Sequence, residues 1–181
     1  MEHRYLGDNS VTEGFAFLFQ HLAADPAWLR SRLGVTDTAA VEEQARAAKL
    51  VYLRRYGAKL AYELQLHDEP ASLDPLADVY AGLLSDALHV AWQRDGWLSD
   101  VDPFFYAACY IRAWALETHL RRVLRERFGE HWFDEREAGD FLKQLWRDGQ
   151  RLPAQELLAE LTGEELDFSA LLEDLDLVPS P

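Results

Sequence analysis

Apolar residues recur at helical spacing along almost the whole chain, and this periodicity constrains the fold more than any other feature. No stretch alternates apolar and polar residues in the way that a half-buried β-strand requires. Two Asp-Pro pairs, Asp74-Pro75 and Asp102-Pro103, add start signals, because an N-cap aspartate followed by proline is typical of a helix N-terminus. The sequence therefore predicts an all-α fold.

Start and stop signals divide this pattern into about seven helices. We expect five helices at about Val11–Ala23, just after Pro26, from Thr36 or Asp37 to about Leu66, from Pro75 to about Arg94 and from about Phe104 to Phe128. Two or three shorter helices follow, around Ala138–Gly149, Pro153–Leu161 and Ser169–Leu175. A chain of 181 residues can bury a sizeable core, so we expect residues 1–181 to form a single domain. Its acidic C-terminal end is expected at residues 162–181, since no Lys or Arg follows Leu152.

Composition excludes several classes of protein. The formal charge of −14 argues against nucleic-acid binding, which needs a basic surface. No stretch approaches the roughly 18 continuous apolar residues of a membrane span, and the polar first ten residues do not resemble a signal peptide. The single cysteine, Cys109, allows no intrachain disulfide. We therefore expect a cytoplasmic protein that binds neither nucleic acid nor membrane.

Glu13 is a lone carboxylate near the start of an apolar, aromatic helix, which makes it the first candidate for a functional residue. Ser10-Val11-Thr12-Glu13 matches the capping box, in which Ser10 and Glu13 each accept a hydrogen bond from the other's backbone N–H. A carboxylate at this place also favours the positive end of the helix dipole. The alternative is that Glu13 is a metal ligand whose companion ligands lie elsewhere.

Tyr106 and Tyr110 are the second candidate, within the stretch Asp100–Trp114. They are four residues apart, so both hydroxyls project from one face of one helix. One interpretation is aromatic core packing with the hydroxyls at its edge. The other makes the hydroxyls donors to a developing oxyanion.

Other catalytic motifs are missing from the sequence. The six histidines include no pair at four-residue spacing, and no HExxH motif is present. Glycine-rich phosphate loops and the G-x-S-x-G nucleophile motif are also missing. Cys109 carries no signature of a nucleophile and is interpreted as a small buried residue.

Taken together and in this order, the two stretches resemble a known family. S-V-T-E-G-F-A-F-L-F resembles the helix that carries the third zinc ligand in thimet-oligopeptidase-like and oligoendopeptidase-F-like metallopeptidases. F-Y-A-A-C-Y looks like the later tyrosine motif of that family, close to G-Y-x-A-x-Y-Y-x-Y. The resemblance extends over residues 1–161 and implies the C-terminal half of a gluzincin oligopeptidase catalytic domain.

The resemblance implies a role for each matching residue. Glu13 falls on the carboxylate zinc ligand, Tyr106 on the tyrosine that hydrogen-bonds the tetrahedral intermediate, and Tyr110 on a neighbouring pocket tyrosine. It implies that Glu13 faces these tyrosines across a cleft. Three positions depart from the family pattern. Val101 replaces a substrate-contacting histidine, Ala113 replaces the last motif tyrosine, and Gln20 stands where the family often has a second acid.

The missing HExxH segment limits what this chain is expected to do. The family's spacing places that segment before Met1, so the chain lacks the general base and two of the three zinc ligands. We expect a portion of a zinc metallopeptidase that neither cleaves peptides nor retains stoichiometric zinc by itself, and that acts on peptides when the segment is supplied. The apolar face left uncovered invites self-association. The alternatives are a non-catalytic helical interaction module derived from such a peptidase and, from charge alone, an acidic nucleic-acid mimic.

Overall fold

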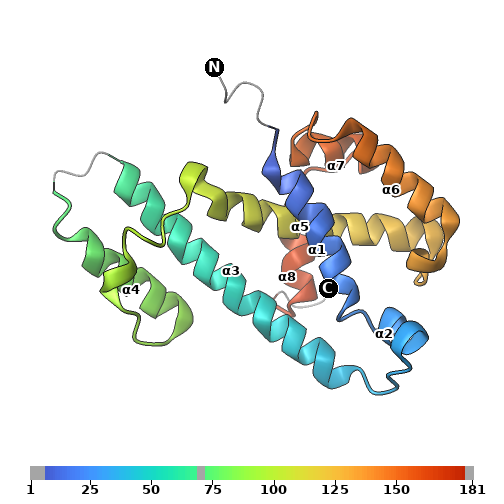
Figure 1. The fold of residues 1–181 in the computed structure, drawn as a ribbon, viewed down its shortest axis with the longest axis horizontal. Helices are drawn as coiled ribbons and strands as arrows, with labels where there is room; N and C mark the ends of the chain where they lie inside the picture. The colour runs from blue at the N-terminus through green and yellow to red at the C-terminus, as the bar shows by residue number, and fades with distance from the viewer. Residues whose placement is uncertain (1–6, 69–71, 178–181) are drawn as a thin grey trace. The chain divides into compact units, whose positions relative to one another are not determined.

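The computed structural model describes residues 7–68 and 72–177, and every regular element in these ranges is helical (Figure 1). The α-helices are α1 (Asn9–Leu22), α2 (Pro26–Leu33), α3 (Ala39–His67), α4 (Leu76–Leu88), α5 (Tyr106–Phe128), α6 (Arg136–Asp148), α7 (Ala154–Thr162) and α8 (Ser169–Asp174). Three short 3-10 helices are η2 (Arg94–Gly96), η3 (Pro103–Phe105) and η4 (Trp132–Asp134). The predicted all-α class is confirmed, with eight α-helices in the described residues where about seven were expected. Among those residues, no helix has both the length and the apolar character needed to cross a membrane.

The described residues separate into two compact units. The first unit contains the residues up to Arg46 together with those from Arg112 onward, and the second is Ala47–Ile111. The long helices α3 and α5 each contribute residues to both units. The expected single domain, with its boundary after residue 161, stays a prediction.

The core of the first unit is built from the apolar faces of four helices and η4. Its buried members are Val11, Phe15, Leu18, Leu116, Leu120, Leu124, Trp132, Ala138, Leu142, Ala154, Leu157 and Leu158. Spacings of three and four residues put these side chains on one face of each helix. Gly14 lets α1 approach α5 closely, because a Cβ at this position would lie 3.0 Å from the Leu116 side chain. Each fully buried leucine contributes roughly 1.5–3 kcal/mol to stability.

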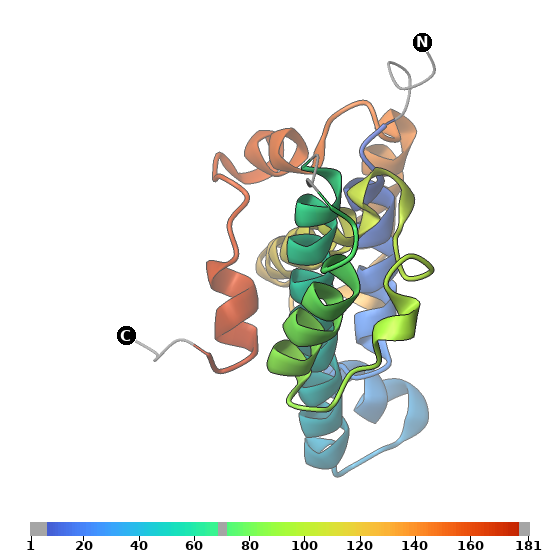
Figure 2. The same ribbon diagram turned by 90° about the vertical axis from the view of Figure 1, so that its left-hand side faces the viewer.

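The second unit has its own smaller core. Leu76, Tyr80 and Leu84 recur every fourth residue on α4 and pack with Tyr62 of α3. In both views α4 lies beside the later part of α3 and runs in the opposite direction (Figures 1 and 2). The rings of Tyr62 and Tyr80 meet edge to face with their centroids 5.1 Å apart. Two aromatic residues therefore supply much of the contact between the two helices.

Two predicted helix ends are confirmed at their glycine or proline signals. α2 starts at Pro26, and the N-cap residue Asp25 accepts a hydrogen bond from the Trp28 N–H at 3.0 Å. α5 ends at Phe128, where Gly129 adopts a left-handed conformation (φ 82°) and its N–H bonds to the carbonyl oxygen of Arg125. The N-cap aspartate and the left-handed glycine are each sufficient to set the helix end.

The helix expected to reach Arg94 ends instead at Leu88. His89 takes a left-handed conformation (φ 55°), and the chain turns back so that the Trp92 N–H donates to Ser85 Oγ at 2.9 Å. The indole N–H of Trp92 then donates to the hydroxyl of Tyr80 at 3.0 Å. The packing of one tryptophan thus ends a helix that the sequence pattern would continue.

α5 starts later than expected, because η3 precedes it. Phe104 and Phe105 have positive φ angles of 61° and 53°, which break the helix between Pro103 and Tyr106. A left-handed conformation costs a non-glycine residue roughly 1–2 kcal/mol. The expected start at Phe104 is therefore wrong by two residues.

The predicted capping box at the start of α1 is also wrong. The N-cap residue is Asp8, and its Oδ1 accepts the Ser10 N–H at 2.9 Å. This is the N–H that Glu13 was expected to bind. Asp8 also accepts the Ala154 N–H at 2.9 Å and pairs with Arg112 at 2.7 Å. One carboxylate therefore starts α1 and joins it to α5 and α7.

These contacts hold the pKa of Asp8 below its ordinary value. Burial is the largest single influence and raises the pKa, but it is outweighed by the hydrogen bonds from Ala154 and Ser10 and by the charge of Arg112. A lowered pKa means that the contribution of Asp8 to stability is present above the unfolded-state pKa of about 3.9 and is lost as the pH falls through the folded-state value.

We expect Asp8→Ala to lower the free energy of unfolding by about 2–4 kcal/mol at pH 7, because it removes a helix cap and the carboxylate that pairs with Arg112. Asp37→Ala is the matched control, since exposed Asp37 makes a single 3.3 Å bond to the Ala39 N–H at the start of α3. It should cost about 0.5 kcal/mol or less. Urea unfolding measures both, and equal losses would contradict the central role of Asp8.

Candidate functional site

Glu13 is the fifth residue of α1 and is half-buried. Because Asp8 occupies the Ser10 N–H, capping no longer accounts for a carboxylate at this position. In the part of the chain that the structure describes, no group of three or more His, Cys, Asp or Glu side chains is arranged to hold a metal ion. The residues present here do not by themselves form the zinc site that the resemblance implies, and no catalytic step follows from Glu13 alone.

Tyr106 and Tyr110 lie on the first turn of α5, as the sequence predicts, and both are half-buried. Their rings meet edge to face with centroids 5.0 Å apart, and Tyr56 of α3 lies 5.0 Å from Tyr110. Three tyrosines from two helices therefore form one aromatic cluster in the second unit. Glu13 belongs to the first unit, so its predicted proximity to the tyrosines stays a prediction.

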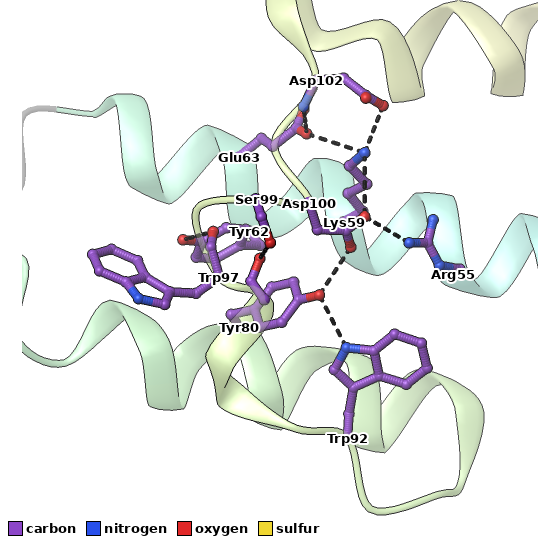
Figure 3. Close-up of polar contacts among 11 residues, drawn as sticks. Arg55, Lys59, Tyr62, Glu63, Tyr80, Trp92, Trp97, Ser99, Asp100 and Asp102 are labelled. Carbon is purple, nitrogen blue, oxygen red and sulfur yellow. Dashed lines mark hydrogen bonds and ion pairs between the residues drawn. The ribbon is translucent and has the colours of Figure 1, made fainter.

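A buried polar network joins α3 to the segment that precedes η3 (Figure 3). Its centre is the ammonium group of Lys59, a residue only 3% exposed. The Lys59 Nζ atom lies 2.5 Å from Asp102 Oδ2 and 3.8 Å from both Glu63 Oε1 and Asp100 Oδ1. Three carboxylates thus surround one cation inside the second unit.

Glu63 ties this network to the backbone. Its Oε1 accepts the Asp102 N–H at 3.0 Å, while its buried Oε2 has no hydrogen-bond partner among the described residues. Burial raises the pKa of Glu63, and the hydrogen bond from Asp102 and the charge of Lys59 only partly oppose this effect. Protonation of Glu63 would reduce the excess of negative charge around Lys59.

Asp100 connects the network to the aromatic residues of the second unit. It accepts hydrogen bonds from Arg55 at 2.7 Å and from the Tyr80 hydroxyl at 2.9 Å, and Tyr80 in turn accepts from Trp92. Burial is the main cause that raises the pKa of Tyr80, so its hydroxyl stays protonated and donates to Asp100. The Tyr62 hydroxyl donates to the carbonyl oxygen of Trp97 at 2.7 Å.

The network fixes the position of Asp102. Lys59 and Glu63 on α3 hold both the side chain and the N–H of Asp102, which immediately precedes η3 and the tyrosine turn of α5. They therefore set where the backbone enters the segment that carries Tyr106 and Tyr110. No sequence motif marked this network, although Lys59 and Glu63 have the i, i+4 spacing of a helical ion pair.

Comparison with protein-family models, with curated proteins and with solved structures found no significant match.

Lys59→Met should lower the free energy of unfolding by about 2–4 kcal/mol, because it leaves the buried Glu63 without this cation, whereas Asp100 keeps Arg55. The control is Lys143→Met, which removes an exposed ion pair with Asp140 of similar length, 3.1 Å. That change should cost roughly 0–1 kcal/mol. A Lys59 variant as stable as the Lys143 variant would show that the network contributes little.

The raised pKa of Glu63 predicts a pH dependence of stability opposite to the one that Asp8 produces. Its contribution to stability is complete below the ordinary glutamate pKa of about 4.3 and is lost as the pH rises through the folded-state value. Glu63→Gln removes this dependence, so we expect the variant to gain stability relative to wild type between pH 4 and pH 7. Thermal unfolding across this range tests the change, with Glu137→Gln at an exposed position as control. If Glu63→Gln instead loses stability relative to wild type as the pH rises, Glu63 does not have a raised pKa.

Proposed function

We propose that the chain is the C-terminal portion of a zinc-dependent metallopeptidase catalytic domain similar to the oligopeptidases, and that it is inactive alone. The observation that carries the proposal is the contact between Tyr106 and Tyr110, whose ring centroids lie 5.0 Å apart on α5 as the tyrosine motif of the resemblance implies. Glu13 is half-buried on α1, at the position that the resemblance matches to the carboxylate zinc ligand. The adjacency of Tyr106 and Tyr110 on one turn of α5 supports the second part of the motif.

The residues would act as follows in a complete domain. Glu13 would supply one carboxylate to the zinc, which needs two imidazoles and an open position besides it. Tyr106 would donate a hydrogen bond to the oxyanion, and Tyr110 would line the pocket that holds the peptide. Lys59 and Glu63 would position these tyrosines by holding Asp102. The two imidazoles and the general base belong to the HExxH segment, which this sequence does not contain.

The second candidate is a non-catalytic helical interaction module, which includes self-association. Large apolar side chains on α3 favour it, since Val51 is 53% exposed and Leu64 is 56% exposed. This candidate requires no relation between Glu13 and the tyrosines.

The two candidates differ in where Glu13 must lie, and the native Cys109 can report this. A nitroxide label on Cys109, one residue from Tyr110, broadens the amide signals of nearby residues. If the chain is part of a peptidase domain, amides around Glu13 should broaden as those around Tyr56 do. Tyr56 is the internal reference, because its ring contacts Tyr110. The unlabelled Cys109→Ser protein provides the baseline.

Broadening at Tyr56 without broadening at Glu13 would contradict the peptidase proposal. An experimental structure with the Glu13 carboxylate more than about 15 Å from both hydroxyls would do the same, since zinc–ligand bonds are only about 2 Å long. Quenched fluorescent peptides complete the test. We expect no hydrolysis by the purified chain with or without added zinc, and hydrolysis that survives Glu13→Gln would also count against the proposal.

A further inference from the structure

His119 is a buried histidine that the proposed function does not use. It lies on α5 in the first unit, and its side chain is 6% exposed. Its Nε2 atom is buried and has no hydrogen-bond partner among the described residues. Buried side-chain nitrogens are nearly always hydrogen-bonded, so an orphaned one calls for a ligand or another explanation.

His119 faces a cavity of about 360 Å³ with an acidic wall. Four carboxylates from the end of the chain line it: Glu164, Glu165, Asp167 and Glu173. Arg122 also lines the cavity, and it lies 3.4 Å from Glu173, while Asp167 and Glu164 are the carboxylates nearest to His119. The cavity therefore combines a buried nitrogen donor with an excess of negative charge.

The distances suit a shared cation better than a direct hydrogen bond. His119 Nε2 lies 3.5 Å from Asp167 Oδ1, and His119 Nδ1 lies 4.0 Å from Glu164 Oε2. Strong N–H···O bonds are shorter, about 2.7–3.2 Å. Two ligands bound to one tetrahedral zinc ion at about 2.0–2.2 Å are about 3.4 Å apart. The His119–Asp167 separation matches this value.

Asp167 is oriented for such a role by its neighbours. One carboxylate oxygen accepts the Ser169 N–H at 3.1 Å, and the other accepts the Ser169 hydroxyl at 3.0 Å. An ionised, hydrogen-bonded carboxylate is the usual supported metal ligand.

We propose that this cavity binds one divalent cation of the zinc class through His119 Nε2 and Asp167. Glu164 or Glu165 completes the coordination by a side-chain rotation, since no third ligand in the described residues is already in place. The imidazole nitrogen favours zinc over calcium or magnesium, which prefer all-oxygen sites. The bound ion links the segment between α7 and α8 to α5. Glu13 is not a ligand of this site. Because only two ligands are already in place, the site holds zinc weakly and a chelator removes it.

The test is a calorimetric titration of the chelator-stripped full chain with Zn²⁺. We expect saturation at one zinc per chain, weakened at least about tenfold by His119→Gln and by Asp167→Asn. His131→Gln is the matched control, because His131 also lies near an aspartate, with its Nδ1 3.9 Å from Asp134 Oδ2, but is exposed. Binding by His131→Gln and by Glu13→Gln should equal that of wild type.

Several outcomes would overturn the proposal. Absence of saturable zinc binding by the wild-type chain would overturn the site. Binding lost in Glu13→Gln but kept in Asp167→Asn would place the zinc at the peptidase-type ligand instead. If His119→Gln fails to fold, imidazole proton signals decide in the wild-type protein. Zinc must shift those of His119, and a shift confined to other histidines overturns the site.

Discussion

Buried charges need partners, and in this protein several of those partners come from distant segments. Asp25 is 1% exposed and pairs with Arg125 at 2.8 Å, a hundred residues further along the chain. The buried Arg121 pairs with Glu117 and also with Asp174 of α8. Burial lowers the pKa of Arg121, but these two carboxylates outweigh it and raise the pKa. Removing either partner of such a pair leaves an uncompensated charge in the interior, so the ion pairs select the arrangement of helices within each unit.

The same requirement changes the interpretation of the candidate residues. At the start of α1 the capping role belongs to Asp8, because Arg112 and the Ala154 N–H hold its carboxylate in place. The capping-box motif at Ser10 and Glu13 is present in the sequence, but the N–H that it needs is already bound. The local motif therefore does not decide which carboxylate caps α1, because the tertiary contacts of Asp8 do.

Much of the fold follows from local signals, and the exceptions have physical reasons. Asp25-Pro26 and Gly129 set helix ends because a cap or a left-handed glycine acts within one turn of the chain. The end of α4 depends instead on Trp92 reaching Tyr80, and the start of α5 on Phe104 and Phe105 leaving helical geometry. The tyrosine pair was visible in the sequence, because four-residue spacing on a helix defines a face. The network around Lys59 was not, because nothing in the spacing of Lys59 and Glu63 says that their face is buried.

The sequence by itself determines the helical class, because periodicity and caps act over a few residues. It also places Tyr106 and Tyr110 on one face of one helix. Burial of Lys59 and the orphaned nitrogen of His119 arise only when segments far apart in the chain meet. Lys59 is enclosed when residues 97–102 fold against α3, and His119 acquires its acidic neighbours when residues 164–173 return to α5. The physical reason is solvation. A charged side chain is stable in water, but burying it costs free energy unless it is paired, and only the assembled core determines whether it is buried.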